Sequence, residues 1–173
     1  MAKHVAWRSW LGAALLGGLG SCTAAPRPHL VFNDFENLAG WVPPAQLTTA
    51  HAYSGRYAAR VAGPADQSVA FQLPLAHLAG SNRLRFSAQL WLGRSAERYP
   101  AVVAQVWHEH NVIHTQYLRL GEVVTRYDQW VPVTMLLTLP GDVNDQDELR
   151  IFVEPGPPAS PLLLDDFTLD DAR

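Results

Sequence analysis

The sequence predicts an all-β domain, an antiparallel β-sandwich of the jelly-roll type, which follows a helical signal segment. Short apolar segments recur along most of the 173 residues and are separated by Gly, Pro, Asn and Asp. Almost none of them has helical periodicity, and residues 83–91 alternate between two faces as a half-buried strand does. Many short strands with turn residues between them are typical of a sandwich or jelly roll.

The predicted strands follow one another at short intervals, and only one helical turn is predicted among them, at residues 75–78 before Gly80. Side chains of a strand alternate between its faces, so each segment has a core side and an outward side. The predicted strands are residues 30–36, 46–51, 57–61, 69–75, 83–91, 101–108, 113–120, 130–139, 148–153 and 162–169.

The first 21 residues have the layout of a secretory signal. Lys3 and Arg8 precede a run of small and apolar residues over 11–20. A stretch of this length is too short to cross a membrane as a mature helix, but it is sufficient for export. The sequence therefore predicts an exported protein.

Cys22 follows Leu-Gly-Ser and is the only cysteine of the chain, so no intramolecular disulfide forms. This segment resembles the lipobox of bacterial lipoproteins, in which the cysteine carries the lipids. The resemblance implies a lipoprotein anchored on a membrane of the cell envelope, with residues 22–29 as a tether and 30–173 as the sandwich domain. Cleavage after Ala24 or Ala25 is the alternative, and it would discard the cysteine.

The charge of the chain argues against nucleic acid as a partner. Without residues 1–21, 11 Arg and no Lys face 16 Asp and Glu, a formal charge of −5. Nucleic-acid binding needs clustered basic residues that neutralise phosphates, and an acidic domain lacks them.

Asp165, in the last predicted strand, carries a negative charge that needs a partner if it is buried. Simple alternation places it on the same face as Phe167 and Leu169, toward the core. A buried carboxylate is costly unless it is paired or bound to a metal. We predict a bound calcium ion; the alternative is that Asp165 accepts backbone hydrogen bonds or pairs with Arg56 or Arg60.

Calcium needs six to eight oxygen ligands, so other segments must contribute. The first predicted strand offers Asp34 and Glu36, and the turn at Ser54-Gly55 offers backbone carbonyls. A further acidic segment, residues 142–148, lacks the glycine that an EF-hand calcium loop needs. We predict that it is a solvated turn.

Three short motifs resemble the carbohydrate-binding modules with a jelly-roll, galactose-binding-like fold: residues 33–36 with Trp41, residues 53–58, and residues 164–169. In such families a structural calcium ion is held by a glutamate of the first strand, by backbone oxygens near the Ser-Gly turn and by an aspartate of the last strand. The resemblance implies a calcium site at Glu36, Ser54, Arg56 and Asp165, with Asp34 and Asp166 as further candidates.

Aromatic and amide side chains on an outward face predict a glycan-binding surface, because sugars stack on rings and hydrogen-bond to planar polar groups. The alternative is that Trp91 and Trp107 close the edges of the sandwich. Trp41 and Trp130 are assigned to the core. The candidate ligand-binding residues are Arg85, Gln89, Trp91, Gln105, Trp107 and Tyr117.

No motif of an enzyme is evident in the sequence, which has no nucleophile elbow, no HExxH and no glycine-rich phosphate loop. The sequence therefore predicts a lipid-anchored, non-catalytic module with a structural calcium ion and a glycan as its partner. The alternative is a domain of the envelope that contacts another protein and binds no glycan.

Overall fold

The structure is a computed structural model of the chain, and it describes residues 29–37, 42–61, 70–78, 80–94, 100–154 and 161–172. The expected signal segment, Cys22 and Trp41 lie outside the described residues. Among the described residues, no helix has the length and apolar character needed to span a membrane.

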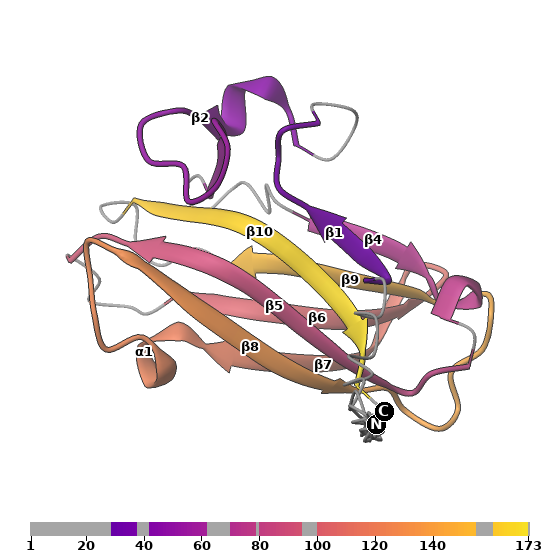
Figure 1. Cartoon of the computed structure of the whole chain (residues 1–173). Coiled ribbons are helices and arrows are strands. Elements are labelled where there is room, and N and C mark those ends of the chain that lie inside the picture. The colour runs from indigo at the N-terminus through magenta and orange to yellow at the C-terminus, as the bar shows by residue number, and fades with distance from the viewer. Residues whose placement is uncertain are drawn as a thin grey trace, which may run out of the picture.

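Two antiparallel sheets pack face to face, as predicted (Figure 1). The six-stranded sheet has the order β2 (Leu47–Thr48), β3 (Ala58–Val61), β10 (Leu162–Asp171), β5 (Arg83–Leu92) and β8 (Trp130–Thr138), and β1 (Val31–Asn33) also pairs with β10. The four-stranded sheet has the order β4 (Ala70–Pro74), β9 (Glu148–Glu154), β6 (Ala101–His108) and β7 (Asn111–Arg119). The described part is thus a β-sandwich of the jelly-roll type.

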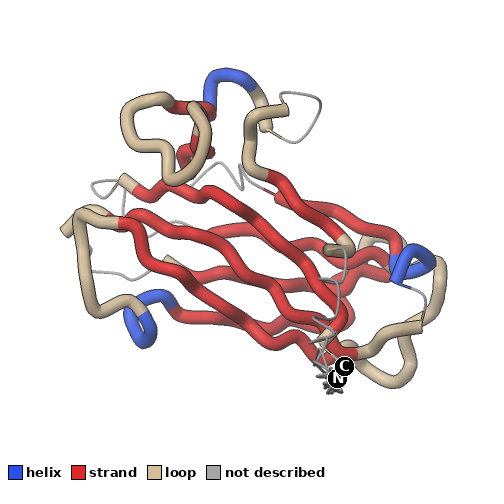
Figure 2. The backbone as a smooth tube through the Cα atoms, viewed as in Figure 1, coloured by secondary structure: helices blue, strands red, loops and turns tan. Residues whose placement is uncertain are grey.

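Helical segments are short and lie at the ends of strands (Figure 2). The turn predicted at residues 75–78 is present as a 3-10 helix. The described helical elements are η1 (Pro44–Gln46), η2 (Leu75–Leu78) and α1 (Leu120–Val123).

Period-two alternation fills the core from both sheets. In β5, Leu84, Phe86, Ala88 and Leu90 are buried in the core, whereas the residues that alternate with them point outward. In β6, Val102 and Val106 face the same core from the other sheet. Each such side chain contributes roughly 1.5–3 kcal/mol through the apolar surface that it removes from water.

The first strand is shorter than predicted, because it ends at Asn33. The side-chain Oδ1 of Asn33 accepts the N–H of Phe35 at 2.8 Å, and Phe35 has a φ of 59°. This local turn competes with the β ladder. It buries Phe35 and directs the following residue, Glu36, away from the strand.

A β-bulge in β10 changes which face Asp165 occupies. The register shifts between Asp165 and Thr168, and Asp166 has a φ of 46°. Asp165 pairs with the outward residue Gln89 of β5, whereas Phe167 returns to the core. The predicted shared face of Asp165 and Phe167 is therefore wrong, because one extra residue reverses the alternation.

The open edges of the two sheets are joined by a side chain. Gln116 of β7 donates through Nε2 to the carbonyl of Thr138 in β8 at 2.6 Å, and its Oε1 accepts the N–H of Thr138 at 3.3 Å. The amide thus supplies edge strand β8 with two hydrogen bonds that a neighbouring strand would otherwise provide.

Asp147 connects the loop before β9 to the end of β6. The segment was predicted to be a solvated turn, but Asp147 is only 1% exposed. Its Oδ1 lies 2.6 Å from Nδ1 of His108, and its Oδ2 accepts the N–H of Asn144 at 2.8 Å. These partners compensate the buried carboxylate.

This pair predicts a pH dependence of stability. The hydrogen bond with Asp147 raises the pKa of His108 above its ordinary 6.5. Although burial opposes it, hydrogen bonding to Asn144 and His108 lowers the pKa of Asp147 below its ordinary 3.8. The stabilisation from His108 is complete below pH 6.5 and is lost as the pH rises through its folded pKa. The contribution of Asp147 is lost at the acid end, as the pH falls through its lowered pKa.

We expect the variant His108→Gln to lose less stability than the unchanged protein as the pH rises. The urea midpoint of the unchanged protein should fall between about pH 5.5 and about pH 8.5, and that of the variant should fall less. His77→Gln, at an exposed position of η2, is the matched control. Equal slopes for the unchanged protein and His108→Gln would contradict the assignment.

Candidate functional site

The described residues of the three motifs that carry the resemblance meet at one place. Residues 51–57, here called the 51–57 loop, contact β10 through the Asp165 carboxylate. The N–H of Tyr53 donates to Oδ2 of Asp165 at 2.8 Å, and the N–H of Ser54 donates to the same oxygen at 3.2 Å. Oδ1 of Asp165 accepts the N–H of Asp166 at 2.8 Å. The last strand therefore binds the loop through backbone donors.

Glu36 binds the other half of the 51–57 loop. Its Oε1 accepts the N–H groups of Arg56 and Tyr57, each at 2.7 Å. Between the two halves, Oγ of Ser54 donates to Oδ1 of Asp166 at 2.6 Å. The segment after β1 and the strand β10 thus hold the same loop, each with a carboxylate.

Asp165 is 0% exposed although it points away from the core, because the 51–57 loop covers it. Burial raises the pKa of the Asp165 carboxyl, and the N–H groups of Tyr53, Asp166 and Ser54 partly oppose this rise. Among the described residues, no arginine forms an ion pair with Asp165. Of the alternatives weighed from the sequence, backbone hydrogen bonding is the one observed.

The fit to a calcium ion can be judged from these donors. Hydrogen atoms of N–H groups point at the carboxylates of Glu36 and Asp165, where a cation requires oxygen ligands. Within the described ranges, no group of three or more His, Cys, Asp or Glu side chains is placed to hold a metal ion. In this arrangement the residues do not fit calcium, because N–H groups already compensate the charge of the Asp165 carboxylate. The ion itself remains a prediction that the structure does not test.

The predicted ligand-binding residues fall into two sets. Arg85, Gln89 and Trp91 lie in β5 of the six-stranded sheet. The other three lie in the four-stranded sheet, on β6 and β7. All point outward from the core, as predicted, but the two sheets present opposite faces. The expectation of one shared face is therefore wrong, since strand order is not encoded in the alternation. The second set is Gln105, Trp107 and Tyr117.

Trp130 belongs to an outward face as well. It pairs directly with Trp91 and is partly exposed, whereas Val131 and Val133 beside it are in the core. Its assignment to the core was wrong. The alternation of β8, in which Val131 and Val133 point inward, predicts that Trp130 points outward.

The outward face of the four-stranded sheet has a polar row between two aromatic residues. The row crosses all four strands in direct register, and Trp107 and Tyr117 lie on opposite sides of it. Tyr117 is 59% exposed. In the same cross-strand row as Tyr117, Val103 and Phe152 belong to a small apolar cluster of this face. The members of the row are Gln72, Arg150, Gln105 and Thr115.

Trp107 is held in a defined orientation. Its Nε1–H donates to Oε1 of Gln105 at 3.0 Å, and the guanidinium of Arg150 lies 4.2 Å from the centre of the ring system. Nε of Arg150 donates in turn to Glu148. The cation–π contact and the ion pair fix one face of the indole while the residue stays partly exposed.

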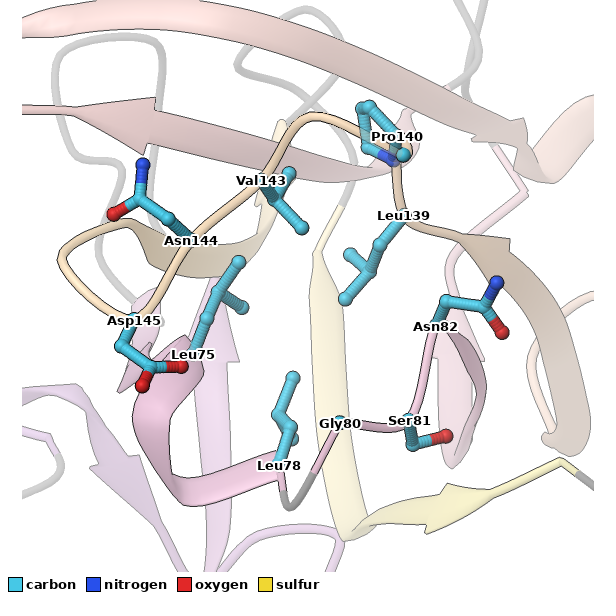
Figure 3. Close-up of a pocket in the computed structure, with 11 residues that line it drawn as sticks. Leu75, Leu78, Gly80, Ser81, Asn82, Leu139, Pro140, Val143, Asn144 and Asp145 are labelled. Atoms are coloured by element: carbon cyan, nitrogen blue, oxygen red, sulfur yellow. The ribbon is translucent and has the colours of Figure 1, made fainter.

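A cavity of about 230 Å³ lies at one end of the sandwich, between η2, the segment before β5 and the loop after β8. Figure 3 shows Leu75, Leu78, Leu139 and Val143 directed toward its centre. None of its described lining residues is aromatic. The aromatic candidate residues Trp91, Trp107 and Tyr117 therefore lie on the sheet faces and not in this cavity.

No protein-family model matches the sequence, and no curated protein matches it. Solved structures do match. The C-terminal family 22 carbohydrate-binding module of Clostridium thermocellum Xyn10B is 15% identical, with a TM-score of 0.54 over 83% of this chain and 93% of that one. The CBM22-1 xylan-binding domain of Paenibacillus barcinonensis Xyn10C is 20% identical, with a TM-score of 0.51 over 83% of this chain and 94% of that one. The chain thus has the β-sandwich fold of these modules.

Proposed function

We propose that this domain is a non-catalytic module that binds a glycan on the outward face of the four-stranded sheet. The observation that carries the proposal is the polar row with Trp107 on one side and Tyr117 on the other. A row of amide, guanidinium and hydroxyl groups offers donors and acceptors to sugar hydroxyls, and the rings offer apolar faces to sugar C–H groups.

The spacing of this face suits an extended chain. Trp107 and Val103, which pairs with Tyr117, are four residues apart along β6, or about 13 Å. An oligosaccharide of several rings spans that distance, with its ends stacked on the two aromatic residues and its middle over Gln105 and Arg150. Because the guanidinium of Arg150 covers one face of the indole, the sugar stacks on the other.

The structural comparison supports the same class of ligand. One matched structure is described as a xylan-binding domain, and it has a TM-score of 0.54, 15% identity and coverage of 83% of this chain and 95% of that one. Xylan is a chain of linked pyranose rings, so it is the first glycan to test.

Tyr117→Ala and Trp107→Ala test the proposal. A stacking aromatic residue at a binding hot spot is worth about 2 kcal/mol, so we expect roughly thirtyfold weaker binding for each variant. A glycan array with plant and bacterial cell-wall oligosaccharides identifies the ligand, and calorimetry measures the affinity. Leu136→Ala, on the other sheet and 58% exposed, is the control. Absence of any glycan signal from the unchanged protein would favour the envelope-protein alternative.

We further propose that the module is exported and anchored by lipid at Cys22, as the lipobox resemblance implies. Cell fractionation checks this: we expect the unchanged chain in the membrane fraction and the Cys22→Ser variant outside it, because acyl chains provide about 0.8 kcal/mol of membrane affinity per buried CH2. An unaltered distribution of Cys22→Ser would contradict the anchor.

A further inference from the structure

Aromatic side chains also gather on the outward face of the six-stranded sheet. Trp91 of β5 and Trp130 of β8 are direct neighbours there. The ring of His51 stacks on Trp91 at 5.1 Å with an interplanar angle of 9°, and Tyr53 contacts Trp130 edge-on at 5.8 Å. We call these four residues the aromatic patch. His51 and Tyr53 form its exposed side, and Tyr53 is 49% exposed.

Packing alone does not account for the exposed rings. The 51–57 loop is already bound to Glu36 and Asp165 through four of its N–H groups. These bonds hold Tyr53 in place whether or not its ring contributes. A ring that is fixed and half exposed is prepared for stacking, because little conformational freedom is lost when a ligand binds.

Planar polar side chains flank the aromatic patch. Gln89 lies two residues before Trp91 on the same face of β5. Arg60 of β3 is exposed and lies in the same cross-sheet row as Trp91, with Leu163 of β10 between them. Within the part of the chain that the structure describes, the side chains of Gln89 and Arg60 have no hydrogen-bond or ion-pair partner. Their donors are therefore available to the hydroxyl groups of a sugar.

We propose that the aromatic patch is a second glycan-binding surface, which takes a pyranose ring on Tyr53 and His51 with hydrogen bonds from Gln89 and Arg60. The ligand class rests on the proposed function of the four-stranded sheet. Because the two surfaces lie on opposite outward faces of the sandwich, one molecule binds two separate chains. The predicted residues Gln89 and Trp91 then serve this second surface.

Calorimetry with xylohexaose and with any oligosaccharide that gives an array signal tests the second surface. We expect two ligands per unchanged chain and one per Tyr53→Ala or Tyr117→Ala chain, with at least a roughly tenfold loss of affinity at the altered surface. The double variant should bind none. Leu136→Ala, exposed on the same sheet but outside the patch, should still bind two.

The outcomes separate this inference from the proposed function. One ligand per chain, lost in Tyr117→Ala and unaffected by Tyr53→Ala, overturns the second surface and leaves the first. One ligand lost in Tyr53→Ala but retained in Tyr117→Ala supports the patch and overturns the proposed site on the four-stranded sheet. No binding by the unchanged protein to any oligosaccharide overturns both.

Discussion

Asp165→Ala is expected to lower the free energy of unfolding by on the order of 3 kcal/mol, because three N–H groups lose their acceptor and each orphaned buried donor costs about 1–3 kcal/mol. The donors are those of Tyr53, Ser54 and Asp166. Such a loss is a large part of the roughly 5–15 kcal/mol that stabilises a typical domain. Urea unfolding measures it, and faster amide exchange at Tyr53 and Ser54 locates it.

Asp142→Ala is the matched control, since this acid is exposed and has no partner among the described residues. Equal stability of the two variants would contradict the role given to Asp165. Thermal melting in calcium and in a chelator adds a second readout. Because N–H donors already compensate Asp165, we expect the same midpoint in both; a clear rise in calcium would establish the ion that the resemblance implies.

Gly55→Ala is expected to cost about 2–3 kcal/mol, from two sources that can be separated. Gly55 has a φ of +54°, which is unfavourable for alanine. A Cβ here would also lie 2.6 Å from Cδ and Oε1 of Glu36, so the glutamate must move and release the N–H groups of Arg56 and Tyr57. Chemical unfolding of the variant measures the total.

Two glycines provide controls for this prediction. Gly80 has a φ of +76° with no atom within 4 Å of a built Cβ, so Gly80→Ala should show only the backbone cost, about 1 kcal/mol. Gly141→Ala meets no atom within 4 Å and should be nearly neutral. In a Glu36→Ala background the clash is gone, so Gly55→Ala should cost about as much as Gly80→Ala. An unchanged cost in that background would refute the contact with Glu36.

The strand faces could be predicted because their signal is local. Alternation in β5 and β6 assigned Phe86 and Val106 to the core, and Gln89 and Trp107 to the outside, and all four are so placed. The same reasoning failed at Asp165, where an extra residue in β10 reverses the alternation. A bulge depends on the backbone conformation of one residue and on the partner strands, and a single sequence does not show it.

The contacts of the candidate site could not be predicted from any single segment of the sequence. Burial of Asp165 was predicted correctly, but its compensation by the N–H groups of Tyr53 and Ser54 required the loop to fold onto β10. Likewise, Trp91 and Trp107 both occupy outward positions of alternating strands. They lie on different sheets, because the order of strands in a sheet depends on the tertiary structure. The sequence analysis did not predict that Gln72 and Thr115 belong to the polar row. Alternation along a strand can assign them to the outward face, but it does not show that they lie beside Arg150 and Gln105.

The amide of Gln116 has a consequence for behaviour at high concentration. The outer edge of β8 would otherwise invite a strand from another molecule, the first step of sheet-to-sheet polymerisation. At Thr138 the side chain of Gln116 occupies both backbone groups, and at Pro132 the same strand has no N–H to donate. Two positions along the edge of β8 are therefore closed to a strand from another molecule, which shortens the stretch on which such pairing could begin.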